Sequence, residues 1–508
     1  MIAKIHSAAC LGIRAYPVEI EVDVANGLPK FIVVGLPDVS VKESKERVRS
    51  AIKNSGYRFP PEKITVNLAP ADIKKEGPAF DLPIALGILA ASGVIESEKL
   101  ESYIFLGELA LDGSLRPFKG AVAVAAGLKK QKAFIFPSET APEAALEKDA
   151  VIYPVRNLQE VIRFLLGEIT LQPVPASEMR SRQGSGVDSV DFSEVKGQNF
   201  AKRAIEIAVA GGHNLLFIGP PGSGKTMLAR RIPTILPPLE FEEALEITKI
   251  YSVAGLAADG ASLIHERPFR SPHHTISAIA LAGGGAWPRP GEISLAHGGA
   301  LFLDEFPEFR RDVLEALRGP LEEGEITISR AKMQLTYPSR FLLVAAMNPC
   351  PCGFLSDPRR ACRCSLGQIQ RYQAKVSGPI LDRIDLHVEV PSLPFQTLSG
   401  DEAAESSKVI RERVLRCRQM QSARFPDRLF KINALMRPRD IKAFARPDAE
   451  GRKLIEAAMK ELQLSARAYF KILKLARTIS DLAECGNIQE EHIAEAIQYR
   501  SLDRQWWS

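Results

Sequence analysis

The chain has 508 residues, of which 45% are apolar and 25% charged, and its net charge is +5 at pH 7. These proportions are ordinary for globular proteins and exclude a disordered chain, while the length predicts about two to four domains. The longest apolar stretches, such as residues 82–91, are too short to span a membrane. Because the first residues also lack the apolar core of a signal peptide, we expect a cytoplasmic protein. The mild positive charge permits nucleic acid as a partner without requiring it.

The pattern of apolar residues along the chain predicts an α/β protein in several parts. Residues 1–171 alternate β-rich and helical runs, as in an α/β or α+β domain. Residues 172–190 are rich in Ser, Gly and Pro, as linkers are. Strands and helices alternate again over residues 191–395, which predicts a nucleotide-binding core with a parallel sheet. Over residues 396–508 the apolar residues recur at three- and four-residue spacing, so we expect a helical lid on that core.

A phosphate-binding loop, or P-loop, is the most specific motif in the chain. The pattern GxxxxGKT lies between an apolar strand at 215–218 and a helix, which is the context that such a loop requires. Its backbone amides would wrap the phosphates of ATP, Lys225 would supply positive charge, and the Thr226 hydroxyl would join the ligands of Mg²⁺. A chance glycine-rich turn is the alternative. The predicted nucleotide-binding residues of the loop are Gly219, Pro220, Pro221, Gly222, Ser223, Gly224, Lys225 and Thr226.

Two further predicted strands end in polar residues that suit such a site. The strand at 300–303 leads into Asp304 and Glu305, at the edge of the sheet where phosphates bind. Asp304 would hold Mg²⁺ and Glu305 would polarise the attacking water; an acidic helix cap is the alternative. The strand at 341–345 is followed by Asn348, whose amide could orient the same water, although a turn Asn before a proline is an equally simple interpretation of this residue alone.

Longer motifs carry a resemblance to a known family. The chain contains, in order, FIGPPGSGKT, FRSPHHTIS, RPGEISLAHGGALFLDEFPEF, AAMNPCPCG and SGPILDRIDLHVEV. With these motifs it resembles, over essentially its whole length, the bacterial ComM/YifB proteins, which are magnesium-chelatase-like AAA+ ATPases related in their motor to MCM helicases. The resemblance implies that Asn348 is the sensor-1 residue, that Arg383 is the arginine finger for a neighbouring subunit's γ-phosphate, and that Arg467 is the sensor-2 arginine. For both arginines a solvated or salt-bridged role stays open.

An arginine supplied by a neighbour implies a ring, and we expect a homo-hexamer. In related motors the piece before sensor 1, here residues 324–338, forms a hairpin, and alternating strand patterns flank residues 329–332 in this chain. Arg330 and Lys332 near the tip would then point into the pore of the ring and contact DNA phosphates. An ordinary basic turn is equally compatible with these residues alone.

Seven cysteines in so long a chain do not form a disulfide scaffold, but four of them cluster in the predicted knuckle at 348–366. Their pattern is CxC, nine residues, CxC. Four thiolates brought together by a turn make a tetrahedral, structural Zn²⁺ site; reduced thiols or a redox-sensitive pair are the alternatives. The predicted zinc ligands are Cys350, Cys352, Cys362 and Cys364.

The N-terminal domain resembles the proteolytic domain of Lon, through APADIKKEGPAFDLPIALGILAASG and GELALDGSLRPFKGAVAVAAGLKK. Lon-type chemistry needs a serine nucleophile and a lysine that takes its proton. Ala79 and Val122 stand at the aligned positions. We therefore expect no protease activity, and instead a role in DNA binding or in organising the ring.

Taken together, these features predict a hexameric ATP-dependent DNA motor with ATP and Mg²⁺ as cofactors. The resemblance implies a helicase or translocase that promotes branch migration during recombination or natural transformation, with single-stranded or branched DNA as its partner. The main alternative is a chelatase-like remodeller that uses ATP to act on a protein partner. Against it stand the Lon-like domain and the cysteine cluster, which a chelatase motor subunit does not need. The missing serine and lysine argue against an ATP-dependent protease.

Overall fold

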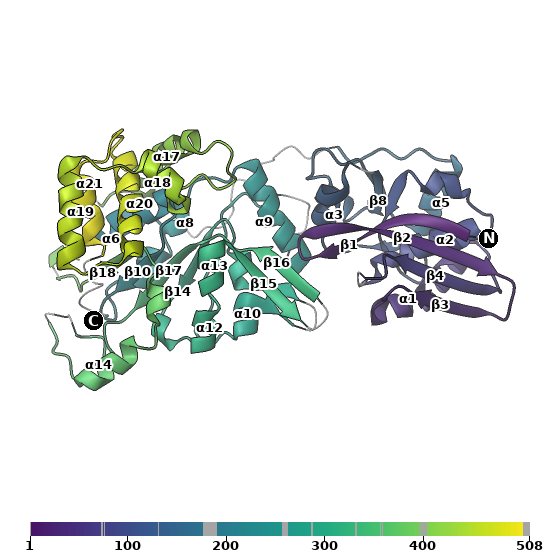
Figure 1. Ribbon diagram of the computed structural model, residues 1–508. Helices are drawn as coiled ribbons and strands as arrows, with labels where there is room; N and C mark the ends of the chain where they lie inside the picture. The colour runs from purple at the N-terminus through teal and green to yellow at the C-terminus, as the bar shows by residue number, and fades with distance from the viewer. Residues whose placement is uncertain are drawn as a thin grey trace. The chain divides into compact units, whose positions relative to one another are not determined.

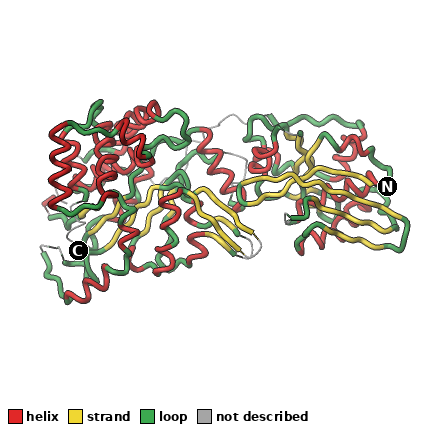
Figure 2. The backbone as a smooth tube through the Cα atoms, viewed as in Figure 1, coloured by secondary structure: helices red, strands yellow, loops and turns green. Residues whose placement is uncertain are grey.

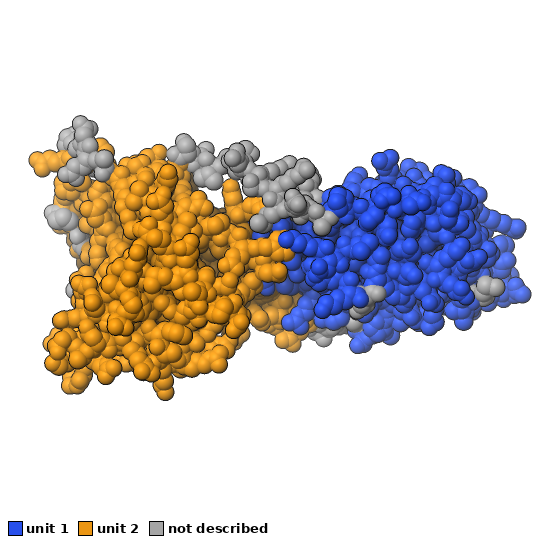
Figure 3. Space-filling model, turned by 90° about the horizontal axis from the view of Figure 1, so that it is seen from above, with its two compact units in different colours: residues 1–181, 244–264 blue, residues 182–243, 265–508 orange. Residues whose placement is uncertain are grey.

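The computed structural model separates the chain into two compact units (Figure 3). The first contains residues 1–181 and 244–264, and the second contains residues 182–243 and 265–508. Residues 244–264 lie within the range predicted for the ATPase core, yet by their contacts they cluster with the N-terminal residues. The described residues are 2–72, 75, 77–130, 132–175, 190–256, 263–285, 288–330, 333–355, 357, 359–394, 396–397 and 404–500.

The first unit is built on a seven-stranded mixed sheet with the strand order β3-β4-β2-β1-β5-β8-β9 (Figure 1). β2 pairs antiparallel with β1 and with β4, and the remaining neighbours are parallel. The strands of this unit are β1 Ile2–Leu11, β2 Arg14–Ala25, β3 Lys30–Val34, β4 Lys63–Ala69, β5 Tyr103–Phe105, β6 Glu108–Leu109, β7 Leu115–Arg116, β8 Ala133–Pro137 and β9 Ile152–Val155. Its helices are α1 Val39–Asn54, α2 Asp81–Ala91, α3 Ala121–Leu128, α4 Ala141–Ala144 and α5 Leu158–Leu166, with 3₁₀ turns at Pro78–Phe80 and Ser97–Leu100.

Helix α2 is the centre of this unit, because every one of its residues is buried. Its sequence DLPIALGILAA has no polar face, as expected for a helix that is covered on all sides. Asp81 at its first position accepts hydrogen bonds from Arg47 of α1, with Nε 2.6 Å from Oδ2. Burial raises the pKa of Asp81 to about 6 even though Arg47 opposes the shift. The pair therefore ties α1 to α2 in a region that is otherwise apolar.

Residues 244–264 include most of helix α9, Phe241–Ala254. Val253 packs beside Gly120, and the side chain of Lys119 lies against Gly255, where a Cβ would come within 2.4 Å of Lys119 Nζ. Ile250 is fully buried. This segment is thus a structural part of the N-terminal unit, although in the sequence it directly follows residues 182–243 of the second unit.

The second unit contains a five-stranded parallel sheet with the order β11-β14-β17-β10-β18. β10, β14 and β17 are buried along their whole length, as expected for parallel strands covered on both faces. Its strands are β10 Leu215–Ile218, β11 Phe269–Arg270, β12 Gly283–Gly284, β13 Arg289–Pro290, β14 Ala300–Leu303, β15 Glu325–Arg330, β16 Met333–Pro338, β17 Leu342–Met347 and β18 Leu386–Glu389.

Helices surround this sheet, and Figure 2 shows that those of the last hundred residues gather into one group. They bury an apolar cluster shared with the sheet, to which α20 contributes Ile472, Leu475 and Ile479. The helices of the unit are α6 Asn199–Gly211, α7 Lys225–Ala229, α8 Ile232–Ile235, α10 Ala278–Ala282, α11 Glu292–Leu295, α12 Arg311–Glu315, α13 Arg318–Glu323, α14 Leu366–Gln373, α15 Gly378–Leu381, α17 Ser407–Arg424, α18 Pro438–Phe444, α19 Ala449–Glu461, α20 Ala466–Leu482 and α21 Glu490–Gln498. Its 3₁₀ turns are Phe192–Glu194, Phe306–Glu308 and Asn433–Leu435.

The predicted hairpin before the strand that leads to Asn348 is confirmed. β15 and β16 pair antiparallel from Glu325 opposite Pro338 to Arg330 opposite Met333. Throughout the described part of the chain, the structure contains no helix with the length and apolar character needed to cross a membrane.

Candidate nucleotide site and cysteine cluster

The P-loop follows β10 directly, at the carboxyl edge of the parallel sheet. Gly222 and Gly224 have φ of +75° and +94°, a conformation that other residues adopt with strain. Gly219 has a different requirement, since a Cβ there would come within 2.1 Å of the Val390 carbonyl oxygen. The loop therefore turns tightly against the end of β18 and delivers Lys225 to the start of α7.

Lys225 is almost fully buried and donates three hydrogen bonds. Its Nζ lies 2.7 Å from the Gly219 carbonyl oxygen, 2.9 Å from that of Pro220 and 3.2 Å from Asn348 Oδ1. Burial lowers the pKa of this amine to about 8, although Asp304 opposes the shift. The structure thus brings two predicted site residues, Lys225 and Asn348, into direct contact.

Thr226 and Asp304 form a second contact between predicted residues. The Thr226 hydroxyl donates to Asp304 Oδ2 at 2.5 Å, and the other carboxylate oxygen accepts the Glu305 N–H at 2.9 Å. A hydroxyl and a carboxylate side by side are the hard oxygen ligands that Mg²⁺ prefers beside phosphates. The contact between these two residues is therefore compatible with their predicted role as Mg²⁺ ligands.

Glu305 has a partner that sequence reasoning missed. His274 Nδ1 lies 2.9 Å from Glu305 Oε2, and its ring packs edge-on against Phe309 at 6.4 Å between centroids. Glu305 has φ of +53°, in the left-handed region that non-glycine residues rarely adopt. The motif FRSPHHTIS contains His274 and was noted in the sequence, but the motif alone does not reveal that this imidazole reaches the acidic strand.

Gln198 is another contact that the sequence did not reveal. Its amide Nε2 donates to the carbonyl oxygens of Pro391, at 2.8 Å, and Ser223, at 3.2 Å. Gln198 itself has φ of +54°. One side chain therefore joins the P-loop to the segment that follows β18.

Arg383 and Arg467 lie together at the opposite, amino edge of the sheet. Both line a cavity of about 650 Å³, together with Asn214 and Glu322. The side chain of Arg383 is 10% exposed and forms an ion pair with Glu322, while the exposed Arg467 lies 3.9 Å from Asp382.

The position of this cavity follows from the register of the strands. The N–H groups of Asp385 and Leu386 both donate to the Asn214 carbonyl oxygen, so β10 and β18 start side by side. Arg383 precedes the start of β18, whereas the P-loop follows the end of β10. The full length of the strands separates the two arginines from the P-loop of their own chain.

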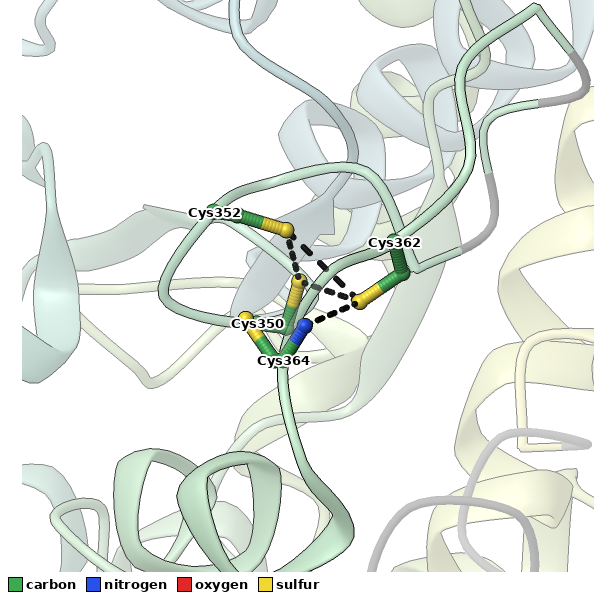
Figure 4. Close-up of side chains that lie close together, drawn as sticks. All are labelled: Cys350, Cys352, Cys362 and Cys364. Atoms are coloured by element: carbon green, nitrogen blue, oxygen red, sulfur yellow. Dashed lines mark hydrogen bonds between the residues drawn. The ribbon is translucent and has the colours of Figure 1, made fainter.

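The four predicted zinc ligands come together, as Figure 4 shows. Cys350 Sγ lies 3.4 Å from Cys352 Sγ and 3.7 Å from Cys362 Sγ, and Cys352 and Cys362 are 3.6 Å apart. All four sulfurs, including that of Cys364, lie within 4.8 Å of one another. Four thiolates about 2.3 Å from a tetrahedral Zn²⁺ would be separated by about 3.8 Å. The geometry of the sulfurs therefore fits a zinc site.

The sulfurs differ in their surroundings. Burial and the neighbouring thiols of Cys352 and Cys362 raise the pKa of Cys350 to about 12. Burial acts in the same direction on Cys352, but backbone N–H groups of Arg363 and Phe354 outweigh it and lower the pKa of that thiol to about 6. The loop thus already stabilises one thiolate, which is the form that binds a metal.

The remaining predicted positions lie at the hairpin tip and in the N-terminal unit. Lys332 and the side chain of Arg330 lie outside the described residues, so the proposed DNA contact at the hairpin tip stays a prediction. In the N-terminal unit Val122 is fully buried, and Ala79 packs against a small apolar cluster that includes Ala121 and Val124. Neither position offers a nucleophile or a base.

Comparisons with known proteins agree with this architecture. Three family models match the chain. The model described as magnesium chelatase, subunit ChlI, matches residues 191–398. The model described as subunit ChlI of Mg-chelatase matches residues 20–140, and the model of the ChlI C-terminal part matches residues 404–500. The chain is 46% identical to YifB of Salmonella typhimurium, over 99% of this chain and 98% of that protein. It is also 46% identical to the competence protein ComM of Haemophilus influenzae, with the same coverage.

The chain belongs to the ComM/YifB family of magnesium-chelatase-like AAA+ proteins. Its mixed α/β structure with a parallel P-loop sheet fits that family, and the family points to ATPase activity. The similarity extends more weakly to a probable DNA helicase, MCM9 of Arabidopsis thaliana, at 26% identity over 40% of this chain and 24% of that protein.

Proposed function

We propose that this ComM/YifB family member is an ATP-dependent DNA motor that works as a homo-hexameric ring, acting as a helicase or translocase that promotes branch migration. The observation that carries the proposal is the separation of two half-sites on one chain. Lys225, Thr226 and Asp304 lie at the carboxyl edge of the sheet, and Arg383 lies at the amino edge. A complete site then needs two protomers, which a closed ring supplies at every interface.

At each interface the residues would divide the chemistry of hydrolysis. On one protomer Lys225 neutralises the terminal phosphates, while Glu305 accepts the proton of a water that attacks the γ-phosphorus, with ADP as the leaving group. Asn348 orients that water. Mg²⁺ bound by Thr226 and Asp304 would neutralise further charge on the phosphates.

The neighbouring protomer would supply the remaining charge. Arg383 must leave Glu322 to reach the γ-phosphate, where its guanidinium stabilises the transition state. Arg467 lines the same cavity, so we assign it to the same interface. The exchange of Arg383 between Glu322 and phosphate would couple hydrolysis to movement between protomers.

DNA is the proposed substrate of the motor. β15 and β16 form an antiparallel hairpin, and we propose that it lies at the pore of the ring, with Arg330 and Lys332 as its DNA contacts. The names of two relatives, a competence protein and a probable DNA helicase, support this assignment. We extend the proposal to a role in recombination or natural transformation, which the name of the competence protein supports.

We propose supporting roles for three further parts of the chain. We assign the N-terminal unit to a Lon-like domain without protease activity, the helices of residues 396–508 to a lid on the proposed motor, and the four cysteines to a structural zinc site.

The second candidate is a chelatase-like remodeller of a protein partner. It is favoured by the family models, whose descriptions name a magnesium chelatase subunit along most of the chain. Such a remodeller would use the same two-protomer ATP site, but its ATPase would respond to a protein rather than to DNA.

A single experiment separates the two candidates. The full-length protein is mixed with ATP and a labelled four-way junction, in parallel with the variants Lys225→Ala and Glu305→Gln. The DNA motor predicts DNA-stimulated ATP hydrolysis and branch migration of the junction by the wild type, and neither by the two variants. If the wild type neither binds DNA nor hydrolyses ATP faster in its presence, the DNA motor is wrong, and stimulation by a protein partner would support the remodeller.

A further inference from the structure

The cysteine cluster contacts the P-loop directly. Gly353, the residue after Cys352, packs its backbone onto the ring of Pro221, so closely that a Cβ on Gly353 would lie 2.4 Å from Pro221 Cδ and 2.8 Å from its Cγ. Gly353 has φ of +84° and donates its N–H to the Cys350 carbonyl oxygen at 2.9 Å. The turn between the first two cysteines is therefore shaped to fit the entry of the P-loop.

The same turn reaches the other end of the P-loop through Asn348. Cys350 is fully buried and lies two residues after Asn348, whose side-chain oxygen accepts the hydrogen bond from Lys225. A shift of the first CxC pair would move both Asn348 and the surface that supports Pro221. The lysine and the loop that presents it are thus held by the residues that flank two of the sulfurs.

The segment between the two CxC pairs forms a second connection. Asp357 Oδ2 accepts a hydrogen bond from Ser392 Oγ at 3.1 Å, and Arg359 Nη1 donates to the Leu393 carbonyl oxygen at 3.2 Å. The neighbouring Pro391 carbonyl accepts the hydrogen bond of Gln198, which also bonds to Ser223 of the P-loop. Both sides of the cysteine cluster are therefore tied to the P-loop by separate sets of contacts.

We propose that a metal ion held by Cys350, Cys352, Cys362 and Cys364 fixes the shape of the P-loop, so that nucleotide affinity depends on metal occupancy. The proposal rests on the zinc site of the proposed function. Four cysteine sulfurs that lie within 4.8 Å of one another suit Zn²⁺ as the bound ion. The metal crosslinks the turn under Pro221 to the segment bound at Ser392 and Leu393. Without that crosslink the turn and the segment move independently, and the free energy that orders the P-loop must come from the nucleotide.

The test measures metal and nucleotide on the same full-length protein. Zinc is quantified by atomic emission after dialysis, and affinity is measured by titration with a fluorescent ATP analogue in the presence of Mg²⁺. The double variant Cys362→Ser and Cys364→Ser should lose its zinc, and its Kd for the analogue should rise by about tenfold or more, since groups misplaced by an ångström lose much of their effect. The control Cys485→Ser, a partly exposed cysteine outside the cluster, should change neither quantity.

A second variant distinguishes a change in the P-loop from a general loss of folding. Gly353→Ala leaves all four sulfurs but forces a side chain against Pro221, so it should keep one zinc per chain and still weaken nucleotide binding. In the wild type, removal of zinc by a chelator should raise the Kd, and added zinc should restore it. Circular dichroism would show that each form is folded.

Two outcomes would overturn the inference. If the wild type contains far less than one metal ion per chain, the zinc site and the coupling are both wrong. If zinc is bound but its removal leaves the Kd unchanged, the coupling alone is wrong. Failure of the DNA motor would appear in the junction assay instead, and it would leave a metal-dependent Kd intact.

Discussion

His274 Nδ1 lies 2.9 Å from Glu305 Oε2, within hydrogen-bonding distance. His274 follows β11 at the edge of the sheet, and Glu305 follows β14, the strand that pairs with β11. The carboxylate proposed to accept a proton from water is therefore oriented by a side chain from the segment that follows the neighbouring strand. A general base must be held in place to act efficiently.

We expect His274→Ala to lower the kcat of ATP hydrolysis by about tenfold while the KM for ATP stays nearly constant, because a positioning group affects the chemical step. His274→Gln should recover part of the rate, since its amide can donate to Glu305. Steady-state ATPase assays with full-length protein measure both constants. His265→Ala, in the segment before β11, is the control; His273 is unsuitable because its ring lies 4.1 Å from that of His274. A kcat unchanged in His274→Ala would show that the contact plays no part in turnover.

Shared ATP sites predict complementation between inactive variants. Lys225→Ala and Arg383→Ala should each be inactive alone, because each removes one half of every site. Mixed at equal amounts before assembly, they should recover ATPase activity, since about a quarter of the interfaces would join an intact P-loop to an intact Arg383.

Lys225→Ala mixed with Glu305→Gln is the matched control for that experiment. Both substitutions affect the same edge of the sheet, so random mixing produces no interface with a complete site. ATPase activity is measured against the ratio of the two variants. Equal activity in the two mixtures, or none in the first, would contradict a site divided between protomers.

The buried amine of Lys225 predicts that nucleotide binding depends on pH. Its pKa in the free protein is about 8, and phosphates favour the charged form, so binding above that pH must take up a proton. The Kd for a fluorescent ATP analogue should be nearly constant below pH 7.5 and should rise by about tenfold between pH 7 and pH 9. Lys225→Arg, which stays charged, should bind more weakly but without this pH dependence. A constant Kd in the wild type would be inconsistent with the lowered pKa.

Asp385 is expected to stabilise the second unit. Its carboxylate lies 3.2 Å from Lys471 Nζ and accepts the Asn214 N–H at 3.1 Å. Burial alone would raise the pKa of Asp385, but Lys471 and His213 outweigh it and hold this pKa far below its usual range. Asp385→Asn would leave the lysine buried and unpaired, so we expect a loss of about 3–5 kcal/mol in the free energy of unfolding.

Urea titration followed by circular dichroism measures this loss. Because the folded pKa is depressed, the stabilisation is fully present above about pH 4 and is lost as the pH falls further. The free energy of unfolding of Asp385→Asn should therefore depend less on pH below 4 than that of the wild type does. The exposed Asp382→Asn is the control, with an expected loss under about 1 kcal/mol. Equal stability of the two variants would rule out the buried pair as a source of stability.

Local patterns in the sequence predicted much of the sheet that carries the P-loop. The strands at 215–218 and 300–303 were placed correctly, because a continuous apolar run next to a specific motif leaves little freedom. The strand before Asn348 was predicted at 341–345, whereas β17 runs to Met347. Its last residues, Ala346 and Met347, are apolar, and the pairing of Met347 with Ile218 in the neighbouring strand extends it.

Contacts between distant residues could not be predicted in the same way. The pair of His274 and Glu305 depends on β11 lying beside β14, and that order is a property of the folded sheet. Gln198 reaches Ser223 only because its own backbone adopts a left-handed turn. The cysteine pattern did predict a cluster, but nothing in its spacing indicates that Gly353 would rest on Pro221.

Because residues 244–264 belong structurally to the N-terminal unit, the polypeptide enters that unit twice. Cutting the chain in the predicted linker at 172–190 would consequently separate residues 244–264 from the rest of their unit. A fragment that begins after the linker would carry a helix deprived of its neighbours, with Val253 no longer covered by the segment around Gly120. Such a truncated protein should tend to aggregate, so the two units are best expressed and studied as one piece.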